Sequence, residues 1–405
     1  MRVNMFAESF RKVTMLRRSA ILVLPGLLVA LITGACSSPP PVTSSAPTAA
    51  LPTTVPPTAA PTSAPASAPT AAPTGAPTSA PTAAPTSVPT SAPTAAPTVV
   101  TLDPITGAPA LARGALRQRP IVVMIDNHPN AYPQSGLDKA AVVFEALAEF
   151  GLTRFMAVYA PGITPEASSI GPVRSARLYF VQWAMEFRGL YVHAGGAPQA
   201  LETLRNTTSL VDVDALFQNR SVYFARIAQR SAPHNLYTDS AALERALRDL
   251  APEPFGDPEI GFLFKPDAPP DARPPARRIE YFFIYREDPA GWTYDPATNS
   301  YLRLRRGRPA IDAVTGQQLR VKNVVVMEVP EKPIPGDDKG RIEQMVIGSG
   351  KARVFMDGVE REVTWQKGAP EDRLLFLDAS GNEIAFNAGQ IWIVALPSLE
   401  NLTIS

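Results

Sequence analysis

The run RPIVVMIDNHPNAYPQSGLDKAAVVFEALAEFGLTRFMAVY at residues 119–159 decides the fold, because it contains three short apolar stretches separated by turn residues. Each stretch has the length and β-branched content of a buried strand, and the predicted strands cover residues 120–126, 141–147 and 155–160. Further along, apolar spacing predicts helices over residues 173–187, 197–205 and 240–250, and a strand over 189–193. This alternation predicts an α/β (α+β) first lobe at residues 102–252.

A second lobe follows a proline-rich stretch. Eight prolines lie between Pro252 and Pro275, which predicts a link between the lobes at residues 253–276. The strands predicted beyond it are residues 280–286, 292–294, 300–304, 321–329, 353–356, 362–365, 374–377, 383–386 and 391–396. Asp357-Gly358 is a two-residue hairpin signal. Residues 277–405 are therefore expected to form a β-rich lobe, either a sandwich or a partly open barrel.

The first residues have the layout of an export signal. Basic residues within positions 1–18 precede an uncharged apolar run at 20–32, which is too short for a comfortable membrane span. The small residues Thr-Gly-Ala then lead to Cys36, as in a bacterial lipobox, although a threonine stands where an aliphatic residue is usual. We expect residues 1–36 to be a lipoprotein signal peptide, with Cys36 lipid-modified and the protein held outside the cytoplasm on the cell membrane. The alternative is an uncleaved signal anchor.

Residues 37–101 predict a disordered tether. From Pro61 to Pro97 proline recurs at every fourth position, with alanine, threonine and serine between. Proline fixes φ and lacks an N–H donor, so this composition favours polyproline II without a packed core. The segment is expected to act as a spacer between the membrane and the folded part.

Composition excludes several classes of function. Residues 102–405 carry 33 positive and 36 negative side chains, a poor balance for binding nucleic acid. Cys36 is the only cysteine, so an internal disulfide framework and a multi-cysteine zinc site are excluded. The three histidines have no metal-ligand spacing, and neither a G-x-x-x-x-G-K-[ST] nor a G-x-G-x-x-G motif occurs. We expect no metal and no cofactor.

All three histidines fall in the first lobe, two of them at the ends of predicted strands. In open α/β sheets, ligands bind beyond the carboxyl ends of the strands. A shared site is therefore one interpretation, and separate structural histidines are the other. The candidate catalytic residues are Asp126, His128, His193 and His234, and their neighbours Asn127 and Asn235 are candidate ligand contacts.

A second candidate site lies in IGPVRSARLYF, residues 170–180. If Pro172 starts a helix, Arg174 and Arg177 lie on one face of its first turns, where the helix dipole disfavours cations unless an anion is bound. Two glycines before the next helix form a further candidate anion site. The residues expected to bind are Arg174, Ser175, Arg177, Gly195 and Gly196. The alternative is that both arginines pair with Glu145 or Glu149 as scaffold.

These segments resemble one known family. The run at 119–159, IGPVRSARLYF, YVHAGGAPQAL and RSAPHNLYTD in the first lobe are similar to the YerB family of bacterial lipoproteins. NVVVMEV, ARVFMDG and QIWIVALP extend the resemblance into the second lobe. The resemblance implies a two-part extracytoplasmic domain of unknown function on a lipid anchor, and it supplies no catalytic residues.

The sequence leaves the activity open between two functions. In the first, a binding module uses Arg174, Arg177 and the Gly195-Gly196 backbone to hold a carboxylate or phosphate of a cell-wall polymer, a peptide or an envelope protein. In the second, a cell-envelope hydrolase or transferase uses His128 or His193 as general base. A purely structural role for these motifs predicts that the histidines lie far apart.

Overall fold

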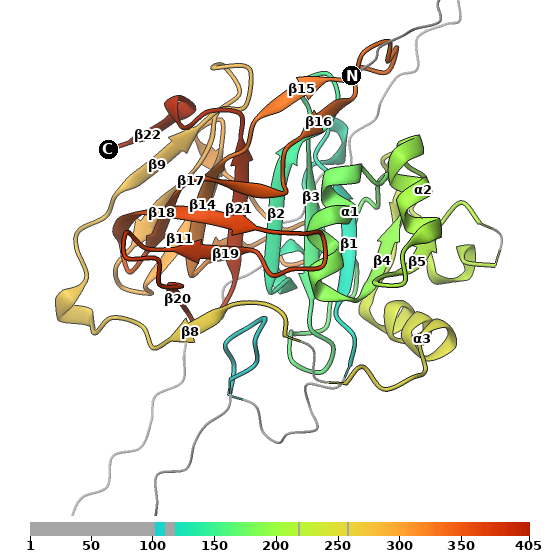
Figure 1. Cartoon of the computed structure of the whole chain (residues 1–405), viewed down its shortest axis with the longest axis horizontal. Helices are drawn as coiled ribbons and strands as arrows, with labels where there is room; N and C mark the ends of the chain where they lie inside the picture. The colour runs from blue at the N-terminus through green and yellow to red at the C-terminus, as the bar shows by residue number, and fades with distance from the viewer. Residues whose placement is uncertain (1–101, 110–117, 218, 257–258) are drawn as a thin grey trace, which may run out of the picture. The chain divides into compact units, whose positions relative to one another are not determined.

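A ten-stranded mixed sheet runs through the molecule (Figure 1). The computed structural model describes residues 102–109, 118–217, 219–256 and 259–405, so the predicted signal peptide, Cys36 and the tether lie outside the described residues. The sheet order is β19 (Leu375–Leu377), β18 (Val359–Lys367), β17 (Gly348–Met356), β14 (Asn323–Glu328), β21 (Ile391–Leu396), β2 (Val142–Leu147), β3 (Thr153–Tyr159), β1 (Ile121–Asp126), β4 (Leu190–His193) and β5 (Val211–Asp214).

The centre of this sheet joins the two predicted lobes. Strand β21, near the C-terminus, pairs in parallel with β14 on one side and with β2 on the other, so that Ile391 lies opposite both Asn323 and Val142. Strand β3 lies between β2 and β1 and is antiparallel to both, and β4 and β5 continue from β1 in parallel. The fold class is the predicted one, an α/β first part followed by a β-rich second part, with one sheet crossing both.

A second sheet covers part of the large one. Its strands in order are β12 (Arg308–Pro309), β11 (Ser300–Arg305), β10 (Ala290–Asp295), β9 (Arg278–Tyr281) and β22 (Leu402–Ile404), with β13 (Arg320–Val321) also on β11. Smaller pairs are β15 (Glu331–Pro333) with β16 (Ile342–Gln344), β20 (Ala385–Asn387) with β8 (Leu263–Lys265), and β6 (Ala225–Arg226) with β7 (Leu236–Tyr237).

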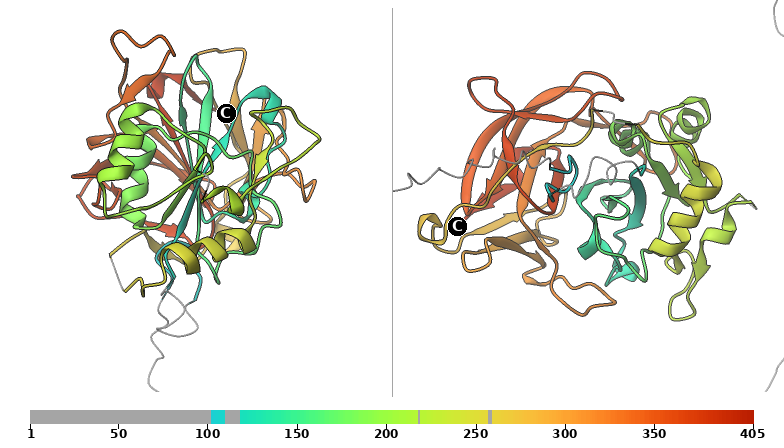
Figure 2. Two further views of the ribbon diagram at one scale, coloured as in Figure 1. Left: turned by 90° about the vertical axis from the view of Figure 1, so that its right-hand side faces the viewer. Right: turned by 90° about the horizontal axis from the view of Figure 1, so that it is seen from below.

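The central strands of the large sheet are buried on both faces, which explains why they are nearly continuous apolar runs. Helices α1 (Leu178–Ala184) and α2 (Pro198–Asn206) cover one face, where Trp183 stacks on Phe144 with ring centroids 5.2 Å apart. The second sheet and helix α3 (Ser240–Leu250) pack on the other face, where Trp292 meets Trp392 edge-on at 5.2 Å. Figure 2 shows the green helices and the gold strands on opposite sides of the sheet.

The predicted hairpin at Asp357-Gly358 is confirmed. Both residues have positive φ, 55° and 72°, and Met356 pairs with Val359 across the turn. Two consecutive residues of positive φ match the right-handed twist of the flanking strands. Asp357 also has a structural role of its own, because its carboxylate binds the predicted inter-lobe link.

The predicted helix over residues 173–187 is wrong at its start. The chain stays extended there because its backbone is paired with neighbouring segments: Val173 N–H donates to Leu236 C=O and Arg174 N–H to Met124 C=O. Helix α1 begins only at Leu178 and ends in a turn of 3₁₀-helix, Met185–Phe187. Arg174 and Arg177 therefore do not lie on the first turns of a helix, and the helix-dipole argument for an anion there does not hold.

Candidate functional site

Asp126, the last residue of β1, is the centre of the candidate site. Its side chain is 5% exposed. One carboxylate oxygen, Oδ2, accepts hydrogen bonds from Nε of Arg174 at 2.9 Å and from Nδ1 of His234 at 2.7 Å. The other oxygen, Oδ1, accepts the backbone N–H of His128 at 3.0 Å. One carboxylate thus brings together three segments that are far apart in the sequence.

His128 and His234 stack on each other, with ring centroids 4.5 Å apart and the planes 22° from parallel. Nδ1 of His128 accepts the backbone N–H of Asn130 at 3.1 Å, so the proton of the neutral ring lies on Nε2. Burial and the neighbouring His234 lower the pKa of His128 below its ordinary value of 6.5, against an opposing effect of Asp126. His128 is therefore an uncharged N–H donor at neutral pH.

Several nitrogen atoms of this cluster have no protein partner within the described ranges. They are Nη1 and Nη2 of Arg174 and Nε2 of His128 and of His234. Solvent reaches them, since the side chain of Arg174 is 22% exposed and that of His234 is 12% exposed. The cluster therefore presents guanidinium and imidazole N–H donors beside one imidazole nitrogen, on His234, that can accept a proton.

The two candidate asparagines already have protein partners. Asn127 is buried, donates from Nδ2 to Oγ1 of Thr153 at 2.5 Å, and accepts at Oδ1 from Gln134 Nε2 at 3.0 Å. Asn235 accepts at Oδ1 from Nη1 of Arg226 at 2.7 Å. Both asparagines therefore hold the loops next to Asp126 in place.

Arg177 belongs to a different cluster. Its Nε donates to Oε2 of Glu149 at 2.9 Å, and its Nη2 and the Nη2 of Arg154 both bind Oε1 of the same carboxylate. Burial would raise the pKa of Glu149, but Arg154 and Arg177 outweigh burial and lower it. Arg154 also donates to the backbone carbonyl of Ser175 at 2.9 Å. Arg177 and Ser175 thus form part of the scaffold behind Arg174.

Glu145, the other acid weighed as a partner for these arginines, binds elsewhere. It accepts from Nη2 of Arg303 at 2.8 Å and from Tyr281 Oη at 2.9 Å, both from the second sheet. The indole N–H of Trp392 donates to the same carboxylate at 3.0 Å. This buried network joins β2 to the second sheet and takes no part in the cluster at Asp126.

The Gly195-Gly196 turn binds a carboxylate of the chain itself. Gly195 N–H donates to Oδ1 of Asp214 at 2.8 Å, and Leu216 N–H binds the same oxygen at 3.0 Å. Gly195 has φ +63°, in the left-handed region where a side chain would strain the backbone, so this turn favours glycine. The anion expected at Gly195 is thus the side chain of Asp214.

His193 is fully buried at the end of β4. Its Nε2 lies 2.7 Å from Oδ1 of Asp212 and its Nδ1 lies 2.8 Å from the carbonyl of Gly195. Both ring nitrogens are engaged, so His193 stabilises the β4–β5 edge and does not face solvent. The structure therefore brings together Asp126, His128, Arg174 and His234, and places His193, Arg177, Ser175, Gly195 and Gly196 in neighbouring scaffold contacts.

Sequence reasoning missed the acidic partners Asp212 and Asp214 and the base Arg154. The alternation Val-Asp-Val-Asp at 211–214 was a usable signal, because a period of two places both aspartates on one face of the strand. No comparable local signal marks Arg154, whose partner Glu149 lies within the β2–β3 turn.

Among the described residues, no group of three or more histidine, cysteine, aspartate and glutamate side chains is arranged to hold a metal ion. In the same ranges, none of the helices combines the length and apolar character that crossing a bilayer requires.

With this fold and cluster in view, the chain belongs to a two-part family. Residues 105–253 match the family described as "Protein of unknown function (DUF3048) N-terminal domain", and residues 279–393 match the corresponding C-terminal domain. A relative named "Putative lipoprotein YerB", from Bacillus subtilis (strain 168), is 30% identical over 312 residues, which cover 75% of this chain and 88% of the relative. The crystal structure of Bacillus subtilis YerB superimposes with a TM-score of 0.66 at 28% identity, over 75% of this chain and 99% of that one. The resemblance seen in the sequence is thereby confirmed.

Proposed function

We propose that the protein is a lipid-anchored extracytoplasmic protein whose Asp126 cluster binds an anionic group. The export signal predicted to end at Cys36 and the similarity to a relative named as a putative lipoprotein support the location. The tether at 37–101 would then link the folded part to the lipid-modified Cys36.

The arrangement around Oδ2 of Asp126 carries the binding proposal. By accepting from Arg174 and His234 at once, this oxygen fixes both side chains and leaves their outer nitrogens without protein partners among the described residues. The preorganised guanidinium of Arg174 can donate two hydrogen bonds to a carboxylate or phosphate, and the Nε2–H of His128 is a further donor. The ligand class that fits is a carboxylate or phosphate of a cell-wall polymer, a peptide or an envelope protein.

Replacing Arg174 tests this proposal. We expect Arg174→Ala to weaken retention of purified anionic cell-wall fragments about tenfold to hundredfold, the loss that corresponds to one charge-assisted hydrogen-bonded contact. Titration calorimetry on the full chain measures it. Arg361→Ala is the matched control, because Arg361 is exposed on β18 and lies outside the cluster. A folded Arg174→Ala protein that retains the fragments as well as the control does contradicts the proposal.

An envelope hydrolase or transferase is the second candidate, and the 2.7 Å contact between Asp126 and His234 favours it. A carboxylate that orients an imidazole through Nδ1 leaves Nε2 as a general base, and Arg174 would stabilise a developing oxyanion. The base would then be His234 instead of His128 or His193. Product analysis of the same mixtures separates the candidates, because conversion of the fragments that is lost in His234→Asn supports catalysis.

A further inference from the structure

The loop after β5 is the most apolar exposed segment next to the Asp126 cluster. Three large apolar side chains point to solvent within seven residues: Leu216 is 64% exposed, Phe217 58% and Val222 68%. We call the described residues from this loop to the end of the following hairpin turn, 215–217 and 219–235, the arginine loop. It projects from the edge of the large sheet beyond β5, at the right of Figure 1.

The charge of the arginine loop is opposite to that of the rest of the folded part. Residues 215–235 contain Arg220, Arg226 and Arg230 and no acidic residue. The remainder of residues 102–405 carries 30 positive and 36 negative side chains. We call the exposed side chains of Leu216, Phe217 and Val222 the apolar tips. A cationic segment with apolar tips, on a folded part that is otherwise acidic, is complementary to an apolar surface that carries negative charge.

Hydrogen bonds hold the arginine loop in a defined shape. Asp214, just before it, is buried and accepts Leu216 N–H, while Phe217 C=O accepts the N–H groups of Arg220 and Ser221. Tyr223 is buried and donates to Oδ2 of Asp249 on α3 at 2.8 Å. The apolar tips are therefore presented by a hydrogen-bonded turn that is tied to the rest of the fold.

The arginine loop also adjoins the Asp126 cluster. Leu216 packs on Gly195, whose neighbour Ala194 donates to the carbonyl of Arg174 at 3.0 Å. At its other end the loop contains His234, and Arg230 donates from Nη2 to Pro133 C=O at 2.6 Å, in the segment after His128. Both ends of the arginine loop thus adjoin residues of the Asp126 cluster or the segments that hold it.

We propose that the arginine loop docks onto the surface of an anionic lipid bilayer, with Leu216, Phe217 and Val222 in the interface and Arg220 and Arg226 against lipid phosphates. Partly inserted apolar side chains flanked by cations are the ordinary means of interfacial membrane attachment. This inference rests on the proposed location at the membrane. It adds a second contact between the folded part and the bilayer, so that the tether need not be extended.

A tryptophan placed at Phe217 tests the inference directly. The four native tryptophans, Trp183, Trp292, Trp365 and Trp392, are all buried at 1% exposure or less, so lipid quenchers do not reach them. The full chain carrying Phe217→Trp is purified from bacterial membranes and reconstituted into vesicles of phosphatidylglycerol and brominated phosphatidylcholine. We expect the emission of the new tryptophan to shift to the blue and to be quenched by the brominated chains.

Phe150→Trp is the matched control, because Phe150 is 67% exposed in the β2–β3 turn, outside the arginine loop. The emission of the tryptophan introduced at position 150 should stay unquenched by the brominated chains. Adding Arg220→Ala and Arg226→Ala to Phe217→Trp should weaken binding of the loop to the bilayer about 30-fold, because each arginine near the surface contributes about fivefold. Arg174→Ala should leave the quenching unchanged, which separates this inference from the proposed anion site.

Flotation of the chain with the vesicles reports anchorage separately. A Phe217→Trp chain that floats while its introduced tryptophan stays unquenched overturns the inference, leaves the anchorage standing and favours a protein partner for the exposed tips. Equal quenching of the Phe217→Trp and Phe150→Trp chains overturns the inference as well. A chain that does not float overturns both the anchorage and the inference that rests on it.

Discussion

Asp126 shows how much of a site can depend on one side chain. Its Oδ2 atom carries contacts to two donors from segments 48 and 108 residues away, and Oδ1 anchors the backbone of His128. Because the carboxylate is almost fully buried, its charge is neutralised by these donors and not by water. What faces solvent is therefore the outer nitrogens of Arg174 and His234 and the edge of His128.

The lowered pKa of His128 gives the proposed binding a pH dependence. Above pH 6.5 the ring is neutral and adds no charge. As the pH falls through the lowered pKa of His128, the ring gains a proton and attracts an anion, so retention of anionic fragments should tighten on acidification. His128→Asn keeps a side-chain acceptor for Asn130 N–H and removes the titrating ring.

Retention measured between pH 8 and pH 5 by calorimetry checks this prediction. The tightening should be larger in the parent chain than in His128→Asn, and Arg361→Ala should follow the parent. Equal pH dependence in the parent and in His128→Asn would show that His128 does not face the ligand.

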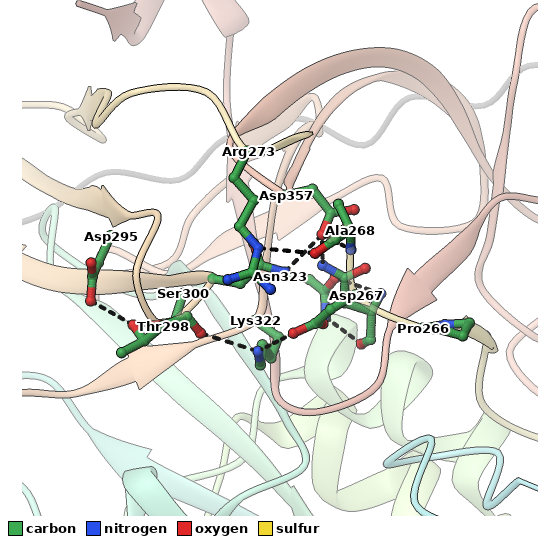
Figure 3. A network of polar contacts seen from close by, with 12 residues as sticks. Pro266, Asp267, Ala268, Arg273, Asp295, Thr298, Ser300, Lys322, Asn323 and Asp357 are labelled. Atoms are coloured by element: carbon green, nitrogen blue, oxygen red, sulfur yellow. Dashed lines mark hydrogen bonds and ion pairs between the residues drawn. The ribbon is translucent and has the colours of Figure 1, made fainter. Parts of the chain in front are cut away.

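At the scale of elements, the predicted inter-lobe link is bound to the β-rich half by the carboxylate of Asp357. Oδ1 accepts from Ala268 N–H at 3.0 Å and from Nδ2 of Asn387 at 2.7 Å, and Oδ2 accepts from Lys265 Nζ at 2.6 Å. Figure 3 shows Asp357 beside Ala268 and, next to it, Lys322 reaching Asp267. Residues 263–268 of the proline-rich segment therefore form a fixed strap, in which strand β8 is held in register with β20.

Asp357→Asn should destabilise the fold by about 2 kcal/mol, because it removes a charge-assisted contact to Lys265. Asparagine tolerates the positive φ of this position, so the change isolates the charge. Burial would raise the pKa of Asp357, but hydrogen bonds from Lys265, Asn299, Ala268 and Asn387 lower the pKa to about 2. The carboxylate therefore stabilises the fold above pH 3.8, and this contribution is lost as the pH falls toward 2.

Urea unfolding measures the difference between the parent chain and Asp357→Asn, which should be present at pH 7 and shrink below pH 4. Asp378→Asn is the control, since that side chain caps an exposed turn. A parent and variant of equal stability at pH 7 would mean that the strap does not depend on this charge.

Local patterns were sufficient for most elements and for part of the site. Strands β1, β2, β4 and β21 were predictable, because short apolar runs between turn residues usually form buried strands. The pairing of β2 with β21 was not, since it joins segments about 250 residues apart with no local signal. The segment after Pro172 was misassigned because tertiary pairing to Met124 and Leu236 overrides its helical spacing. For the site, strand-end position indicated Asp126, but not that Arg174 would bind it while Arg177 binds Glu149.

At the scale of the whole molecule, β21 determines whether there is one sheet or two pieces. It lies between β14 and β2, with Trp392 and Val394 buried against the second sheet. A chain ending at residue 390 would leave β14 and β2 as unpaired edges in the middle of the structure. We expect that chain not to fold.

Limited proteolysis and tryptophan emission check this expectation. The control is a chain ending at residue 398, which keeps β21 and loses only the edge strand β22 and the short turn before it. It should be less stable than the full chain but still folded. Equal protease resistance of the two truncated chains would show that the halves fold without the central strand.

The central position of β21 also has a consequence for how genes of this family are organised. Matches to the two family models lie on opposite sides of residue 277, yet the sheet is completed only when a strand from the second segment enters beside one from the first. A gene that encoded one segment alone would specify half a sheet with an open central edge. If the two segments of this chain were produced separately, we expect that the sheet would be completed only when they assembled through this strand pair.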